Sequence, residues 1–115
     1  MKFKLFRFNK VKSTNNTAIR IIKNYNYEYG MISTNSQING RGQYGKKWIS
    51  YKGNLFVSFF YNLKNFNISL NKLTKVNYLI VKKCISHYYK SKIYFKSPND
   101  LIIKKKKFVA YYKKQ

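Results

Sequence analysis

The sequence predicts an α/β (α+β) protein in which helices flank a mixed β-sheet. Three observations favour this class: cations alternate with apolar residues near the N-terminus, two segments repeat apolar residues at helical spacing, and an aromatic, β-branched run separates those two segments. The predicted order is strand, helix, strand, loop, strand, helix and three further strands, which suits helices packed on a mixed sheet. With 115 residues the chain forms at most one domain with a modest core.

The first half of the chain supplies two strands and a helix. The stretch "FKLFRF" (Phe3–Phe8) alternates with the period of a half-buried strand. Ser13 or Thr14 can cap the helix that follows. A polar second strand is expected over Met31–Gln37. The apolar face predicted for the helix comprises Ala18, Ile21, Ile22 and Tyr25.

The second half predicts a strong strand, a helix and three short strands. Residues 54–63 form the strand, apolar on both faces, and Ser69 begins the helix. A short strand is expected over 92–96, and residues 101–112 predict a hairpin whose turn lies within 104–107. The last strand would leave an open apolar edge, as if the sheet were unfinished. Residues at helical spacing on the second helix are Leu70, Leu73, Asn77, Ile80, Val81, Cys84 and Tyr88.

The charge balance is unusual. Lys and Arg total 25 against 2 acidic residues, which gives a formal net charge of +23. Such a surplus attracts nucleic acid, anionic membranes or phosphate-bearing ligands. The abundance of Lys, Asn, Ile, Tyr and Phe is typical of a very AT-rich genome, and this compositional bias is the favoured explanation of the basicity, with an anionic partner as the alternative.

Composition excludes several chemistries. One Cys and one His cannot form a Cys/His metal cluster, and one Cys cannot form an internal disulfide, which fits a reducing compartment. Two carboxylates, Glu28 and Asp100, make a paired-carboxylate mechanism a poor explanation. Cys84 and His87 could form a nucleophile pair, but a core position for Cys84 and a helix C-terminal position for His87 are favoured. No signal peptide or membrane span is recognisable, so a cytoplasmic protein is predicted.

The stretch "NGRGQYGKKWISYKGN" (Asn39–Asn54) holds four of the five glycines and the only tryptophan. It predicts a loop that offers backbone N–H groups and cations to an anion. It matches neither a Walker loop nor a dinucleotide fingerprint, and a surface hairpin in a basic protein would look similar. Its candidate anion-binding residues are Gly40, Arg41, Gly42, Gly45, Lys46 and Lys47.

Three stretches together resemble the biotin–protein ligases. "KSTNNTA" (12–18) is similar to their S-T-N-x-x-A, and "SQINGRGQYGKKWISYKGNLFVSF" (36–59) to their Q-x-x-G-R-G-R-x-G-R-x-W-x-S-x-x-G-N-L-x-x-S. "FKSPNDLIIKKKKFVA" (95–110) is similar to their K-W-P-N-D-[LI] with a following K-[LIV]-[AS]-G. The resemblance spans essentially the whole chain. It implies the N-terminal part of a BPL/LPL catalytic domain over residues 1–115, with an incomplete fold like that of class II aminoacyl-tRNA synthetases and biotin–protein ligases.

The resemblance implies a two-step reaction. Biotin and ATP, with Mg²⁺, would give biotinyl-5′-AMP and pyrophosphate, and a lysine of the biotin carboxyl carrier protein of acetyl-CoA carboxylase would then attack the mixed anhydride. The glycine-rich loop would close over the adenylate and keep out water. The implied enzyme is a biotin–[acetyl-CoA-carboxylase] ligase, without a membrane or nucleic-acid partner and with a homodimer as a further option.

The resemblance also implies residue roles. Arg41 and Lys107 would be catalytic, and Asp100 would meet Mg²⁺. The implied biotin-binding residues are Ser13, Thr14, Asn15, Gln37, Gly40, Arg41 and Lys107. The implied nucleotide-binding residues are Arg41, Gly42, Trp48, Asn99 and Asp100. Taken alone, Lys107 would be an ordinary solvated turn lysine.

Departures from the family pattern leave alternatives open. Gln43 stands where a second arginine is usual, and Ser97 replaces a tryptophan. The similarity fades from Phe108 onward, and Ala110 stands where a glycine is usual, so a truncated catalytic domain of doubtful activity is expected, without an N-terminal winged helix. A lipoate–protein ligase relative and a small basic nucleic-acid-binding protein are the alternatives.

Overall fold

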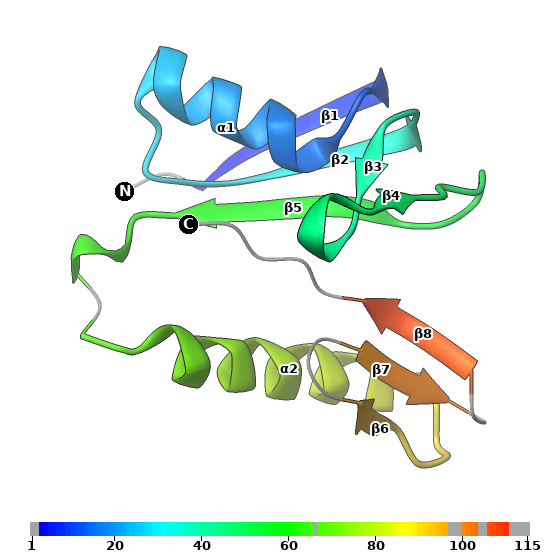
Figure 1. The fold of residues 1–115 in the computed structure, drawn as a ribbon. Helices are drawn as coiled ribbons and strands as arrows, with labels where there is room; N and C mark the ends of the chain where they lie inside the picture. The colour runs from blue at the N-terminus through cyan, green and yellow to red at the C-terminus, as the bar shows by residue number, and fades with distance from the viewer. Residues whose placement is uncertain (1–2, 66, 97–99, 104–105, 111–115) are drawn as a thin grey trace. The chain divides into compact units, whose positions relative to one another are not determined.

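The computed structural model describes residues 3–65, 67–96, 100–103 and 106–110. The chain forms two compact units, Met1–Asn65 and Phe66–Gln115. Each unit holds one long helix and a three-stranded sheet (Figure 1). The predicted α/β class, with a mixed sheet and helices, is confirmed.

The sheet of the N-terminal unit has the order β1-β2-β5. Strand β1 (Lys4–Val11) pairs in parallel with β2 (Tyr29–Gln37), and β5 (Phe56–Tyr61) pairs antiparallel with β2. Helix α1 (Thr14–Tyr25) is the connection that two parallel neighbours require, and it lies against one face of the sheet (Figure 1). The predicted strands Phe3–Phe8, Met31–Gln37 and 54–63 are therefore present with shifted ends.

Local chemistry sets both ends of α1. The hydroxyl of Ser13 accepts a hydrogen bond from the backbone N–H of Asn16, which confirms Ser13 as the N-cap. Asn26 ends the helix in the left-handed conformation (φ 54°, ψ 38°), and its N–H bonds to the Ile22 carbonyl. Asparagine tolerates this conformation better than most residues.

The core of this unit joins α1 to the sheet. Ile32 is fully buried and packs with Ala18, Ile21 and Phe60. The predicted helix face was only half right: Ile22 and Tyr25 are exposed, at 40% and 66%. The buried face continues instead through two threonines of the first turns, Thr14 and Thr17, because the sheet lies against that side of α1.

The stretch predicted as a loop contains a small hairpin. Strand β3 (Gly40–Arg41) pairs antiparallel with β4 (Lys47–Trp48), across a 3-10 turn at Gln43–Gly45. Tyr44 and Gly45 both have positive φ, and the Gly42 N–H bonds to the Lys46 carbonyl at 2.7 Å. Two-residue strands carry too little alternation to be recognised in a sequence, which explains why the sequence could not separate a loop from a hairpin here.

The C-terminal unit contains α2 (Leu70–Ser86) and an antiparallel sheet in the order β6-β7-β8. The strands are β6 (Tyr94–Lys96), β7 (Asp100–Ile103) and β8 (Lys106–Ala110). The Tyr78 and Phe95 rings, 4.5 Å apart, join α2 to β6. Ser69 caps α2, as predicted, and the predicted hairpin is present. Residues 104–105 of its turn lie outside the described residues.

The predicted core position of Cys84 is wrong. Cys84 is exposed, and none of the side chains of α2 is fully buried. The half-buried stripe runs through Leu73, Asn77 and Val81, which leaves Cys84 and Ile80 on the accessible side. His87 is the C-cap residue of α2, as predicted.

Replacing Gly30 by alanine is expected to destabilise the N-terminal unit by about 1–3 kcal/mol, because overpacking a filled core has that cost. A Cβ at Gly30 would lie 2.4 Å from Phe60 Cζ and 2.7 Å from the Lys4 carbonyl oxygen. Urea unfolding followed by circular dichroism measures the loss. Ser33→Ala, on the opposite face of β2, is the control and should leave the midpoint unchanged. An unchanged midpoint in Gly30→Ala would contradict the close packing.

Candidate functional site

The site of the N-terminal unit begins at the first turn of α1. Ser13 is only 3% exposed, and its carbonyl accepts hydrogen bonds from the backbone N–H of Thr17 at 3.0 Å and the Thr17 hydroxyl at 2.9 Å. Thr14 is buried beside it. Capping of this kind uses some of the free N–H groups at a helix start, and the partial positive charge of the helix N-terminus remains.

Gln37 ties this helix start to the glycine-rich segment. Its side-chain oxygen accepts from the Thr14 N–H at 2.9 Å, and its side-chain nitrogen donates to the Ser50 hydroxyl at 3.1 Å. One carboxamide at the end of β2 therefore bridges residues far apart in the chain. The loop connecting β2 to the hairpin is fixed further by the Asn39 N–H, which donates to the Lys12 carbonyl at 2.7 Å.

A second polar link joins α1 to β5. The Ser58 hydroxyl bonds the Thr14 hydroxyl at 2.8 Å and also bonds the Asn15 side-chain oxygen. A serine hydroxyl has one proton to donate. Ser58 therefore donates its hydrogen bond to the Asn15 side-chain oxygen and accepts one from the Thr14 hydroxyl. This assignment leaves the Asn15 side-chain NH₂ as a donor for a ligand.

The hairpin approaches the helix start through Arg41. Its guanidinium Nη2 donates a hydrogen bond to the side-chain oxygen of Asn16. Gly40 sits so tightly that a Cβ there would lie 2.6 Å from Gln37 Nε2 and 2.8 Å from Ser50 Oγ. Only glycine allows this close approach.

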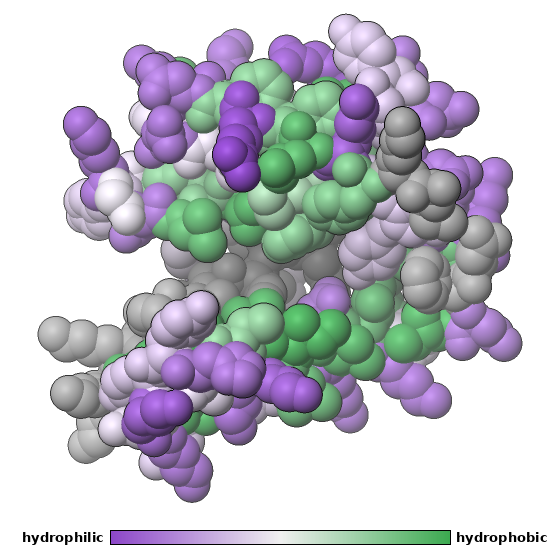
Figure 2. Space-filling model, turned by 180° about the vertical axis from the view of Figure 1, so that it is seen from behind, coloured by the Kyte–Doolittle hydropathy of each residue, from purple (hydrophilic) through white to green (hydrophobic). Residues whose placement is uncertain are grey.

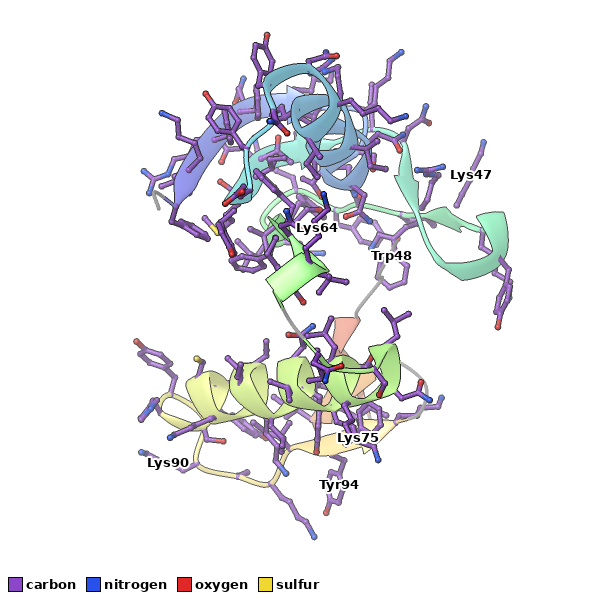
Figure 3. The ribbon with its side chains drawn as sticks, turned by 90° about the vertical axis from the view of Figure 1, so that its left-hand side faces the viewer. Lys47, Trp48, Lys64, Lys75, Lys90 and Tyr94 are labelled. Carbon is purple, nitrogen blue, oxygen red and sulfur yellow. The ribbon has the colours of Figure 1, made fainter. Side chains whose placement is uncertain are left out.

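A shallow pocket of about 280 Å³ opens between this hairpin and the end of β2. The side chains of Lys47 and Trp48, the second of which is 40% exposed, leave β4 on opposite sides (Figure 3). The pocket thus combines an aromatic face with backbone and side-chain donors. It is lined by Gln37, Ile38, Asn39, Gly40, Lys47, Trp48, Ile49 and Ser50.

The structure gathers most of the predicted site residues in one unit. Those of the first helix turn, of the end of β2 and of the hairpin are connected by the contacts above. In the C-terminal unit, the backbone of Asp100 pairs with Lys96 and Ala110, and that of Lys107 pairs with Ile102. The side chains of Asp100 and Lys107, and all of Asn99, lie outside the described residues.

The sequence alone suggests no role for three residues of the network: Asn16, Ser50 and Ser58. Ser50 and Ser58 fall on serines of the family pattern, so the pattern offered a clue. Asn16 falls on a variable position, and nothing in the sequence distinguished it from its neighbours. Its importance depends on a contact with Arg41, 25 residues away.

The cations and N–H donors of this site suit anionic ligands. On the face shown in Figure 2, hydrophilic side chains are widespread, with apolar ones between them. The described residues contain no group of three His, Cys, Asp or Glu side chains suited to hold a metal ion. Among the described helices, none has both the length and the hydropathy needed to cross a membrane. The side chains that the structure describes around this site include no carboxylate, and such a set of cations and N–H donors suits phosphate or carboxylate ligands.

Gln37→Ala is expected to lower the free energy of unfolding by about 1–3 kcal/mol, since the Thr14 N–H loses its acceptor. Gln37→Glu keeps that acceptor and places a carboxylate at a helix N-terminus, so it should retain stability. Urea unfolding and hydrogen exchange of the Thr14 amide measure both effects. An equal loss in the two variants would indicate that the Gln37 side-chain NH₂, which donates to Ser50, rather than the side-chain oxygen, supports the helix start.

Comparison with known proteins places this chain in a family. The family model described as "Biotin/lipoate A/B protein ligase family" matches residues 5–112. Among solved structures, the Aquifex aeolicus biotin protein ligase in complex with biotin and ATP is similar over 90% of this chain and 43% of its own, with 31% identity and a TM-score of 0.76.

Two more distant structures share the fold. One is the Helicobacter pylori biotin acetyl coenzyme A carboxylase synthetase with bound biotinylated ATP, at 22% identity and a TM-score of 0.75, covering 97% of this chain and 56% of that one. The other is the Leishmania major biotin protein ligase in complex with biotinyl-5-AMP. It has 20% identity and a TM-score of 0.75, covering 90% of this chain and 49% of that one. The chain thus spans about half the length of the structures it matches. With the family match extending over nearly all of its residues, the chain belongs to the biotin/lipoate A/B protein ligase family.

Proposed function

We propose that this chain is part of a biotin–protein ligase, with residues 1–115 corresponding to the N-terminal part of its catalytic domain. The proposed reaction joins the biotin carboxylate to the α-phosphate of ATP and then passes biotin to a lysine of a biotin carboxyl carrier protein. One observation carries the proposal: Arg41, on a glycine hairpin, is held beside the capped N-terminus of α1.

Electrostatics supports this assignment. Biotin and ATP are both anionic, and their reacting oxygens repel each other until cations screen them. Arg41 provides a planar fork of donors for carboxylate and phosphate oxygens. Backbone N–H groups near Gly40 would add fixed dipoles, whereas the Gly42 N–H already bonds the Lys46 carbonyl within the hairpin. No acid or base from the protein is required, which agrees with a chain that has two carboxylates.

Polar residues at the start of α1 are proposed to receive the biotin ring. Ser13, Thr14 and Asn15 lie within one turn, and the Asn15 amide keeps free donors once its oxygen has bonded Ser58. Gln37 would contribute its remaining N–H. Trp48 would offer its exposed face to the adenine ring. Lipoate is the alternative acid, since the family description covers both.

Residues of the C-terminal unit complete the proposal. Lys107 would stabilise the charge that develops between the biotin carboxylate and the α-phosphate. Asn99 and Asp100 would face the nucleotide. Asp100 is one of only two side-chain carboxylates in the chain. A single carboxylate can bind Mg²⁺ when phosphate oxygens and water provide the remaining ligands.

The test is incorporation of labelled pyrophosphate into ATP by the 115-residue chain, with biotin or lipoate as the acid. Biotin should support exchange and lipoate should not. Arg41→Ala should slow exchange by about 10²–10³-fold, the usual loss when one donor to a developing charge is removed. Arg7→Ala, an exposed arginine of β1, is the matched control and should leave the rate unchanged.

Exchange that depends on lipoate alone would reassign the acid. An absence of exchange with both acids, together with no binding of biotinyl-5′-AMP, would contradict the proposal. Strong, steeply salt-dependent binding of a random oligonucleotide under those conditions would favour the nucleic-acid alternative.

A further inference from the structure

We propose that Asn16 is a positioning residue, which holds the Arg41 guanidinium at the site without neutralising its charge. The identity of the ligand that Arg41 binds rests on the proposed function. The way in which Asn16 holds Arg41 rests on geometry alone. The observation is the hydrogen bond from Arg41 Nη2 to the Asn16 side-chain oxygen.

Asn16 is a fixed point from which to hold a flexible side chain. It lies in the first turn of α1, where its backbone N–H bonds the Ser13 hydroxyl at 3.3 Å. The cap therefore uses the backbone of Asn16 and leaves its side chain available. The buried neighbours Ser13 and Thr17 anchor the same turn in the core.

Arg41 needs such an anchor, because the hairpin that carries it holds its side chain only weakly. In the β3–β4 pair, Arg41 lies directly across from Lys47. Like charges at opposed positions destabilise a strand pair. Lys46 adds a third cation next to them, and the turn contains the positive-φ residue Tyr44, which is 94% exposed. Two-residue strands alone would hold Arg41 weakly.

A neutral amide acceptor has a chemical advantage over a carboxylate. A guanidinium has five N–H donors, and the bond to Asn16 uses one. The remaining donors and the whole positive charge stay available for an anionic ligand. An aspartate at this position would also orient Arg41, but it would cancel much of that charge and compete with the ligand.

Two readouts follow the hairpin without any ligand. Trp48 is the only tryptophan, and it pairs with Gly40 next to Arg41, so acrylamide quenching of its fluorescence reports the hairpin alone. Trypsin cleavage after Lys46 and Lys47, followed by mass spectrometry, reports local opening. Asn16→Ala should increase cleavage by about three- to tenfold, as expected for the loss of one exposed hydrogen bond to a charged group.

Asn16→Asp separates orientation from charge. It should keep the cleavage rate and Trp48 quenching of the unmodified chain, yet bind biotinyl-5′-AMP about fivefold more weakly, the scale of one exposed pair of charges. Asn24→Ala, an exposed asparagine of the same helix, is the matched control and should change neither readout. Circular dichroism checks that every variant is folded.

The outcomes separate cleanly. If Asn16→Ala leaves cleavage and quenching unchanged, or if Asn16→Asp opens the hairpin as much as alanine does, the positioning role is overturned. Unchanged binding of biotinyl-5′-AMP by Asn16→Asp would overturn the advantage of a neutral acceptor. If the hairpin responds as expected but the unmodified chain binds no biotinyl-5′-AMP, the proposed function fails while the positioning of Arg41 stands.

Discussion

The hydrogen bond between the Thr14 N–H and the Gln37 side chain is the constraint on which the site of the N-terminal unit depends. It joins the first turn of α1 to the end of β2, and the same carboxamide reaches Ser50 beyond the hairpin. A helix start in a protein interior needs such partners, because its N–H groups have no acceptors within the helix. Here the partner also sets where the glycine hairpin leaves the sheet.

The glycine hairpin next to this hydrogen bond allows close approach of its backbone to neighbouring side chains, at the expense of its own stability. Gly40 brings the backbone against Gln37 and Ser50, where a side chain would collide. Beyond it, cations face each other across short strands, and Tyr44 adopts a conformation that costs free energy for a non-glycine residue. Segments of this kind open easily, which would suit the proposed function, in which the loop admits and then encloses a ligand.

At this hairpin, the surplus of positive charge has a specific structural setting. Elsewhere on the chain, basicity is as well explained by composition as by function. At Arg41, however, the guanidinium is directed by an uncharged neighbour, Asn16, so its charge is retained where an anion can meet it. Orientation without neutralisation is what electrostatic stabilisation of a reacting phosphate requires.

The sequence by itself determined the two helices with their serine caps, the main strands and the family, because these depend on local periodicity, on hydrogen bonds within one turn and on contiguous patterns. Only the tertiary structure decided which face of each helix is exposed, as Tyr25 and Cys84 illustrate. It alone also decided the partners of Gln37, Asn16 and Ser58, which bond residues 23, 25 and 44 positions away. No local rule predicts such pairs, since they form only once the sheet has brought the ends of β2, β5 and α1 together.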